Sequence, residues 1–533
     1  MGTARLGKLL TVHSIRRIWI ISLVGYLLLT AGWALALPTN GTYDEEDHAI
    51  RAYAVASGQV YADGDTVRVP RSLLPDGIDC TWERNNAKSA ACQSPISDAS
   101  LARTPSTAAR YSPVYYFPVG LPLLLSPNHT GIVLARMMSG LLCGLLLASA
   151  FAIAAWLRRP LLLAGLALAN TPMLFNLAGA INPNGLEIAA GTSLWVALLG
   201  LLLADETGPR LKLVDDPVIR RLVLVASVSA ALLITVRQLG PLLLAISAFG
   251  CVLLARQGRL RTLFRRRDVR RIAGGLVGGA VVVFLAWTAT SRIADPAPAP
   301  KVAHPTQMST YEALYGVANT RLPFYIKQLV GQFSYGETPL PFWLVGGWHG
   351  MVIALVLAAA ALATWRYRLV NLGLLASLLG LLVALELYFL PHSGWFSHSR
   401  YVTPAGVGML LLPAFVPALP RLLDRLLPRG TAWATRAVVV LTGLLSLAAL
   451  AKVASRFQNG PAARVNPFTG EWLPPTGPYL PLLALALGAV VIGALTWQLS
   501  SPPATLAEAD LRQPEAEQAT VCSGPSTGTT TRS

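Results

Sequence analysis

The chain alternates long apolar segments with short polar ones, and this pattern permits few folds. It is 53% hydrophobic and only 13% charged, whereas a soluble domain carries about 25% charged residues. A helix needs roughly 20 apolar residues to cross the bilayer core. The sequence therefore predicts an all-α integral membrane protein with a polytopic domain over residues 18–499. Hydropathy places about twelve spans at 18–37, 131–156, 160–177, 185–204, 222–236, 239–255, 272–291, 347–365, 370–390, 401–419, 436–454 and 479–498. The short pair 222–236 and 239–255 also fits a single re-entrant hairpin.

The net charge of +17 is concentrated in alternate loops. Loops rich in Lys and Arg stay in the cytoplasm, which predicts a multi-pass protein of the inner (plasma) membrane with both termini cytoplasmic. Residues 1–17 form the cytoplasmic N-terminus, and residues 500–533, rich in Pro, Ser, Thr and Glu, form a disordered cytoplasmic tail. The basic runs are explained by topology, with contact to membrane lipids second, and we expect no nucleic-acid partner. These runs are Arg5, Lys8, Arg16 and Arg17; Arg158 and Arg159; Arg256 to Arg271; Arg366 and Arg368; and Arg421, Arg425 and Arg429.

Two large loops, 38–130 and 292–346, then face the extracytoplasmic side. The first contains a predicted helix over 43–57 and an aromatic, proline-broken segment over 111–127 that is typical of an interfacial helix. The second contains a helix-like run over 310–333 with Leu314, Val317, Leu322 and Tyr325 on one apolar face. Cys80 and Cys92 lie in the first loop, in an oxidising compartment, and their spacing allows a disulfide.

An acidic run, Asp44 to Asp47, follows the first span directly and ends at His48. Charge this dense beside hydrocarbon needs a partner or a function. Asp44 and His48 share one helix face, where they could hold a divalent cation such as Mg²⁺ or Mn²⁺. Alternatively, one carboxylate acts as a general base. The structural alternative is a capping box between Thr42 and Glu45, with acids in the first turn offsetting the helix dipole.

Further polar residues lie at the outer ends of later spans. Asn182, Pro183 and Asn184 form a turn motif. Arg237 and Arg400 run against the distribution of positive charge, so each requires an anion. A lipid-linked phosphate suits them, because guanidinium binds phosphate oxygens through two parallel hydrogen bonds. Pairing with the acidic run is the alternative, and the two interpretations are compatible in an empty enzyme.

The order of these motifs resembles that of the GT-C-fold membrane glycosyltransferases, and most closely an uncharacterised bacterial multi-pass family placed beside them. The resemblance runs along most of residues 18–420. It begins with Asp44-Glu45-x-x-His48, Arg51-Ala52-Tyr53 and Gly58, and continues through Ser112-Pro113-Val114-Tyr115-Tyr116, Asn182-Pro183-Asn184 and Arg400-Tyr401-x-x-Pro404.

The resemblance implies a GT-C-like bundle of about twelve helices that acts as an inverting glycosyltransferase. The donor would be a polyprenyl-phosphate-linked sugar, and the acceptor an envelope glycan, lipid or protein at the outer face. In such enzymes the first-loop acid is the catalytic base or a metal contact, which corresponds to Asp44 here, with Glu45 second. Glu46 and Asp47 extend the acidic pair and leave the base open. The candidate substrate-binding residues are His48, Arg51, Tyr115, Asn182, Asn184, Arg237, Gln238, His398, Arg400 and Tyr401; Asp44 and His48 are the candidate metal ligands.

Two other classes of protein compete with the enzyme. A transporter or flippase for a lipid-linked or anionic envelope precursor would carry ionisable residues at mid-membrane, often in broken helices. In this sequence the strongly polar residues lie mainly at outer span ends, which favours an enzyme. A non-catalytic scaffold would keep the spans and tolerate the loss of Asp44. We see no phosphate-binding glycine loop, which argues against a nucleotide-dependent enzyme.

Overall fold

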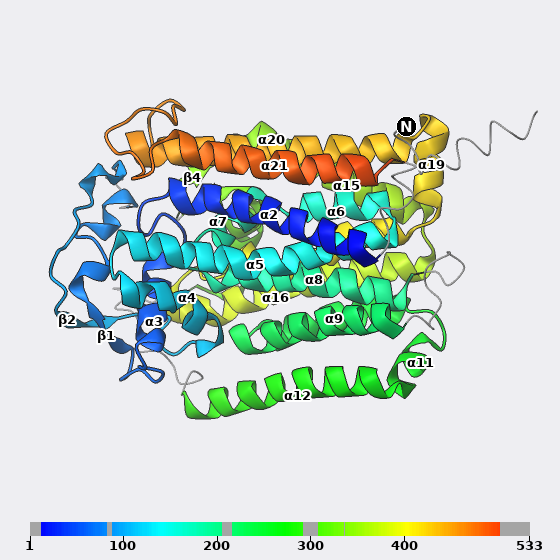
Figure 1. The fold of residues 1–533 in the computed structure, drawn as a ribbon, viewed down its shortest axis with the longest axis horizontal. Coiled ribbons are helices and arrows are strands. Elements are labelled where there is room, and N and C mark those ends of the chain that lie inside the picture. Colours follow the sequence, from blue (N-terminus) through cyan, green and yellow to red (C-terminus); the bar gives the residue numbers. More distant parts are fainter. Residues whose placement is uncertain (1–11, 83–87, 205–215, 292–307, 335, 502–533) are drawn as a thin grey trace, which may run out of the picture.

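The computed structural model describes residues 12–82, 88–204, 216–291, 308–334 and 336–501. Most of the expected N-terminal segment 1–17, the part of the second loop over 292–307, and the expected disordered tail beyond residue 501 lie outside the described residues. The described chain is a bundle of helices with two short hairpins, so an all-α membrane architecture is confirmed (Figure 1).

In the described part of the chain, nine helices are long and apolar enough to span a membrane. Three bent helix pairs could supply further spans, up to twelve in all, which agrees with the number predicted from hydropathy. The nine helices are α2 (Val12–Ala36), α5 (His129–Leu157), α8 (Pro183–Leu202), α9 (Asp216–Val236), α12 (Arg267–Thr290), α15 (Phe342–Leu362), α16 (Trp365–Ser393), α20 (Gly430–Asn459) and α21 (Tyr479–Leu499).

Hydropathy did not reveal the bends. Helices α6 (Pro160–Ala169) and α7 (Pro172–Ala178) meet at 64°, and α10 (Gly240–Leu254) meets α11 (Arg259–Arg265) at 116°. The segment expected as one span over 401–419 is broken into 3-10 turns and short helices before α19 (Ala418–Leu426), with a bend of 63°. Pro404 and Pro413 lie in this segment, and a proline removes a helix hydrogen bond.

Helix α8 is central and α12 is peripheral, because 94% of the membrane-spanning part of α8 is buried within the protein, whereas only 11% of that of α12 is. Helix α2 packs along both α5 and α21. Glycines allow the close approach of α2 to α21, because a Cβ on Gly488 would lie 2.7 Å from the carbonyl oxygen of Gly25, and one on Gly32 would lie 2.8 Å from that of Pro481.

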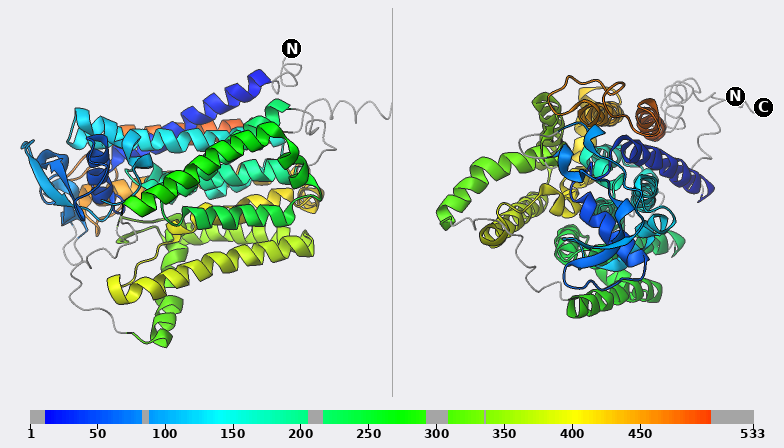
Figure 2. Two further views of the ribbon diagram at one scale, coloured as in Figure 1. Left: turned by 90° about the horizontal axis from the view of Figure 1, so that it is seen from below. Right: turned by 90° about the vertical axis from the view of Figure 1, so that its left-hand side faces the viewer.

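Loops gather at one end of the bundle, which we call the loop end (Figures 1 and 2). The first loop folds into a compact lobe. It contains α3 (Glu45–Ala56), an antiparallel hairpin of β1 (Thr66–Pro70) and β2 (Leu101–Pro105), three short 3-10 helices (Arg71–Leu73, Ile78–Thr81 and Ala90–Cys92) and α4 (Pro113–Leu125). Cys80 and Cys92 form a disulfide in this lobe, with their Cα atoms 6.2 Å apart.

Two further segments complete the loop end. The second loop contains α13 (Thr310–Gly316), a π-helical turn (Val317–Arg321), α14 (Leu322–Val330) and a small hairpin of β3 (Gln332–Phe333) and β4 (Thr338–Pro339). The third connects α20 to α21 over residues 460–478. The opposite end carries the basic helices α11 and α19, so the two ends differ in charge as the sequence predicts.

Candidate functional site

The acidic run does not act as one cluster, because each acid has a different environment. Helix α3 starts at Glu45, and Asp44 precedes it with φ 58°, in the left-handed region. That region is uncommon for residues other than glycine, although Asn and Asp tolerate it. The capping box suggested for Thr42 and Glu45 is not formed, because the Glu45 carboxylate turns into the bundle instead.

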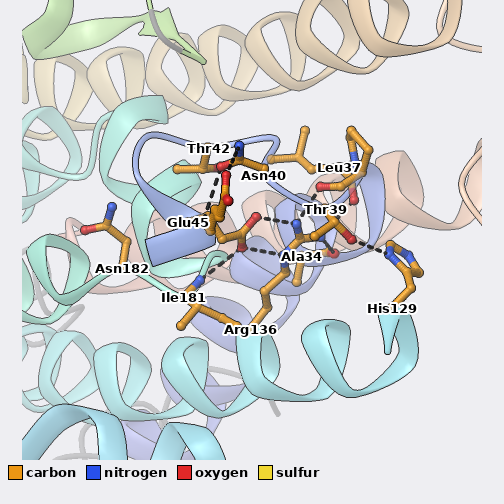
Figure 3. A network of polar contacts seen from close by, with 12 residues as sticks. Ala34, Leu37, Thr39, Asn40, Thr42, Glu45, His129, Arg136, Ile181 and Asn182 are labelled. Atoms are coloured by element: carbon orange, nitrogen blue, oxygen red, sulfur yellow. Dashed lines mark hydrogen bonds and ion pairs between the residues drawn. The ribbon is translucent and has the colours of Figure 1, made fainter. Parts of the chain in front are cut away.

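Glu45 forms a buried ion pair with Arg136 of α5 (Figure 3). Its oxygens accept from Nε at 2.7 Å and from Nη2 at 2.6 Å, and Oε1 also accepts from the Ile181 amide at 3.1 Å. The two side chains are 1% and 0% exposed. Arg136 also donates to three carbonyl oxygens at the end of α2 and just beyond it, those of Ala34, Leu37 and Pro38. Every charge here is satisfied within the protein, as a buried ion pair requires.

Asp44 forms an ion pair of another kind, with Arg400. Nη2 of Arg400 donates to Oδ2 of Asp44 at 2.6 Å. The Arg400 side chain is 1% exposed but that of Asp44 is 40% exposed, so the carboxylate is open on one side. Nε and Nη1 of Arg400 are buried and have no hydrogen-bond partner among the described residues. Burying two guanidinium nitrogens without hydrogen-bond partners costs free energy while the site is empty. An anion that accepts from them would remove this cost.

Arg237, just after α9, lies beside this pair. Nη1 donates to Oδ1 of Asn184 at 2.6 Å, and Nε is 3.9 Å from Glu187. Its guanidinium lies over the ring of Tyr401, 5.0 Å from the centroid, and that of Arg400 lies 5.4 Å from the same centroid. The two cations, which we call the arginine pair, therefore both lie against one aromatic ring.

Glu46 and Asp47 are held within the lobe. Glu46 contacts Asn40 through both its backbone and its side chain. Burial, with Asp79 and Asp47 nearby, raises the pKa of Glu46 to about 7. Asp47 accepts from the amide and hydroxyl of Thr107 at 2.6 and 2.7 Å. Neither acid contacts Arg400 or Arg237 through an ion pair in the described residues, so Asp44 is the acid of the run that lies at the arginine pair.

His48 does not combine with Asp44 into a metal site. Its Nδ1 is 2.8 Å from the Tyr116 hydroxyl, and its ring is buried. Burial, with Arg237 and Arg400, holds the pKa of His48 well below its usual range. Two arginines beside the carboxylate repel a divalent cation. In the described ranges no three His, Cys, Asp or Glu side chains are grouped so that they could hold a metal ion. The donor set therefore does not fit the Mg²⁺ or Mn²⁺ expected from the sequence.

Three of the other predicted residues, Asn182, Asn184 and His398, lie beside the arginine pair. Asn182 donates to the Tyr43 carbonyl at 2.8 Å and accepts from the side chain of Asn184 at 2.8 Å, so the turn connects the acidic run to Arg237. His398 contacts Gln328 at 2.7 Å, and burial together with Arg400 keeps its pKa well below the usual range.

Arg51, Tyr115 and Gln238 lie outside this centre. Arg51 donates to the backbone of Tyr111 and Val60 and holds the lobe together. The Tyr115 hydroxyl bonds that of Ser139 at 3.0 Å inside the bundle. Gln238 is exposed and lines a small pocket beside Arg237.

Sequence reasoning missed Arg136, Tyr43 and Gln328. Arg136 had a readable signal, namely an arginine within an apolar span. The ring of Tyr43 lies 4.4 Å below the Arg400 guanidinium, and Gln328 bonds the segment before Arg400. Neither of these two roles has a local sequence signal.

Comparison with known proteins gave two similar solved structures. Both are crystal structures of ArnT from Cupriavidus metallidurans, one bound to undecaprenyl phosphate and one in the apo state. Sequence identity is 15% and 14%, and the TM-scores are 0.40 and 0.35. The matches cover 90% of this chain and 77% and 76% of the ArnT chains. Among curated proteins, none matches the sequence. Residues 27–409 match the family model described as "Predicted membrane protein (DUF2142)", and the chain therefore belongs to this family of membrane proteins.

Proposed function

We propose that this protein is an inverting membrane glycosyltransferase that takes a sugar from a polyprenyl-phosphate donor. One observation carries the proposal: Arg400 is buried, directs Nη2 at the half-exposed Asp44, and keeps Nε and Nη1 without partners among the described residues. Arg237 supplies a second positive charge at the Tyr401 ring, 5.0 Å from its centroid. This arrangement suits a phosphate held next to a carboxylate that an acceptor can reach.

The phosphate of the donor would bind at the arginine pair. The unused Nε and Nη1 lie on different edges of the Arg400 guanidinium, so each can donate one hydrogen bond to an incoming anion; the parallel fork that guanidinium favours would also use Nη2, which Asp44 engages in the empty site. The Arg400 and Arg237 side chains are only 1% and 14% exposed, so their charges are weakly screened. They would stabilise the charge that grows on the phosphate as the sugar leaves.

Asp44 would act as the general base. The acceptor hydroxyl gives its proton to the carboxylate while its oxygen attacks the anomeric carbon from the face opposite the phosphate. The bond from that carbon to the phosphate oxygen breaks, and its electron pair leaves with the polyprenyl phosphate. The configuration at the anomeric carbon inverts. Glu45 is not proposed for this step, because Arg136 and Ile181 already engage both of its oxygens.

The acceptor would be an envelope glycan, lipid or protein, since we assign the loop end to the extracytoplasmic side of the plasma membrane and both termini to the cytoplasm. The support is the basic character of the opposite end. Labelling intact cells with a membrane-impermeant maleimide tests the orientation. A Leu101→Cys variant, exposed in β2, should react before lysis; reaction only after lysis would reverse the orientation.

The charge distribution distinguishes this proposal from a transporter or flippase. Buried Arg and Glu side chains in the described residues lie within about two turns of a span end or in loops: Arg136 and Glu187 near the starts of α5 and α8, and Glu386 near the end of α16. A translocation path would need such groups at mid-membrane.

The deciding experiment measures sugar transfer and binding of undecaprenyl phosphate, the lipid bound in one of the ArnT structures, by Arg400→Lys and Arg400→Ala variants. Lysine keeps the positive charge but lacks the planar guanidinium. We therefore expect both sugar transfer and affinity for undecaprenyl phosphate to fall about 10- to 100-fold, which corresponds to the loss of one hydrogen bond to a charged group. Arg259→Lys is the matched control, because Arg259 is also buried but lies at the basic end. Wild-type transfer and lipid binding by Arg400→Ala would refute the proposed site.

A further inference from the structure

Residues 309–330 of the second loop form a helical segment with three distinct sides. The segment starts with a capping box between Ser309 and Glu312 and continues through α13, the π-helical turn and α14. It crosses the direction of the spans and projects from the side of the bundle; it is the green segment that follows residue 307 in both views of Figure 2. A helix in this position lies parallel to the membrane plane.

The first side faces the protein and holds the segment that precedes Arg400. Arg321 donates to Glu386 at 2.6 Å and to the Ser397 carbonyl oxygen. The Tyr325 hydroxyl lies 2.5 Å from both Glu386 and the Ser397 hydroxyl.

Gln328 continues this side one turn further along. It is completely buried, accepts from the Ser399 amide at 2.9 Å and contacts the ring of His398 at 2.7 Å. Arg321, Tyr325 and Gln328, at spacings of four and three, thus fix residues 397–399 directly before Arg400.

The second side is an exposed apolar stripe. It runs at helical spacing and includes large aromatic residues that are 78% and 63% exposed, Tyr311 and Tyr315. Helix α14 contacts the span α15, whose first residues Phe342 and Trp343 are 86% and 63% exposed. Its members on the segment are Tyr311, Leu314, Tyr315, Leu322 and Ile326. The third side is exposed and polar, with Glu312, Asn319 and Lys327.

We propose that residues 309–330 are an interfacial helix that seats its apolar stripe in the acyl–headgroup boundary of the leaflet at the loop end, and that its protein-facing side positions Arg400. The occupant of the stripe is the lipid surface, because α14 contacts the membrane span α15, and the exposed Tyr residues of the stripe and the exposed Trp343 at the start of α15 are of the two types enriched at membrane–water interfaces. A helix with separate apolar and charged sides lies in this plane. Attachment to the membrane would then set the place of the phosphate-binding arginine. This second part rests on the proposed function, whereas the seating does not.

Spin labels test the seating in protein reconstituted into lipid nanodiscs. Nitroxides are attached at Leu322→Cys and Ile326→Cys, with Lys327→Cys on the polar side as the matched control and Cys522→Ser in the background. The remaining cysteines are buried or disulfide-bonded. We expect the labels at 322 and 326 to collide preferentially with oxygen, which partitions into lipid, and the label at 327 with a water-soluble nickel chelate. Equal nickel accessibility at all three positions would overturn the seating.

Binding of undecaprenyl phosphate tests the positioning role. Gln328→Ala should bind this probe about tenfold more weakly, because a buried hydrogen-bonding group that positions the cation is lost. Gln332→Ala is the control, since the Gln332 side chain bonds Gly336 and not the segment before Arg400. If Gln328→Ala does not fold, Tyr325→Phe removes only a hydroxyl and takes its place.

The outcomes separate the two proposals. A folded Gln328→Ala or Tyr325→Phe with an unchanged melting temperature but weaker binding supports positioning. Wild-type binding by these variants, while Arg400→Ala loses the probe, would reject positioning and leave the proposed function standing. Failure of the wild-type protein to bind the probe would reject the proposed phosphate site without affecting the spin-label result.

Discussion

Asp44 and Glu45 are adjacent in the chain, carry the same charge and each pair with an arginine, yet the two pairs differ in every physical respect that matters for function. The Glu45–Arg136 pair is buried on both sides, and Arg136 donates its other hydrogen bonds to carbonyl oxygens at the end of α2 and just beyond it. The Asp44–Arg400 pair is buried on the arginine side and open on the acid side, with two donors unused. The first is complete without a ligand, and the second is not.

The difference shows how the role of an ion pair at the loop end can be inferred. An arginine whose N–H groups are all paired within the protein is structural, whereas one with unpaired N–H groups can bind a ligand. Glu45 and Arg136 connect α3, α5 and the end of α2, so their pairing stabilises the corner that presents Asp44 (Figure 3). The following variants test whether this division is correct.

The largest effect should come from Arg136→Met. It leaves the Glu45 carboxylate buried without its cation, and breaking a buried pair in this way costs about 3–5 kcal/mol. Unfolding titrations in detergent should show this loss of stability. Arg400→Met is the internal comparison and should cost less than about 1 kcal/mol, because Asp44 stays hydrated. Equal losses for the two variants would contradict the distinction between the fully buried and the open pair.

Asp44→Asn should affect the rate instead of the stability. Asparagine tolerates the left-handed backbone at this position, so the variant should fold normally and bind the lipid donor. Loss of a general base should slow sugar transfer at least about 100-fold. The check is a transfer assay run with a thermal-shift measurement, beside Glu45→Gln, which should lose stability. If the Asp44→Asn variant folds and transfers sugar at the normal rate, Asp44 is not the general base.

The smallest effect concerns Glu46, which, like Asp47, has no ion pair with an arginine among the described residues. Its pKa is raised to about 7 by burial and by Asp79 and Asp47. A raised folded-state pKa means that the stabilising contribution is full below the ordinary pKa near 4.5 and is lost as the pH rises through about 7. Glu46→Gln should therefore gain stability relative to wild type at pH 8 but not at pH 4. Solvent screening keeps the gain below about 1 kcal/mol. Thermal unfolding of both proteins at pH 4 and pH 8 checks this. A stability difference between variant and wild type that does not grow from pH 4 to pH 8 would contradict the prediction.

Much of the fold follows from the sequence, because spans are set by local hydropathy and charge. The predicted number of about twelve spans lies within the nine to twelve that the described helices allow, and the end opposite the loops carries the basic helices α11 and α19, as expected. The expected membership of a family of membrane proteins is confirmed by the match over 27–409. The bends at α6–α7 and in 403–426 were missed, since the apolar composition continues across them.

The site was only partly predictable. Its two charged partners, Asp44 and Arg400, are 356 positions apart, and no local pattern specifies such a contact. The apolar face predicted over 310–333 was partly wrong: Val317 and Tyr325 are buried, whereas Leu314 and Leu322 are exposed. The π-helical turn at Val317–Arg321 shifts the phase of the helix, and hydrophobic periodicity assumes a constant phase.

Arg456, near the end of α20, has a consequence for how the molecule is made. It donates to the carbonyl oxygens of Thr81 and Lys88 in the first loop and pairs with Glu337 in the second. Helix α21, made later still, packs along α2, the first helix of the described chain. The lobe that carries Asp44 emerges early from the ribosome, but the residues that fasten it are synthesised hundreds of codons later. The finished arrangement therefore cannot form during early membrane insertion, and a chain truncated before α20 should insert its first spans yet leave the lobe unfastened.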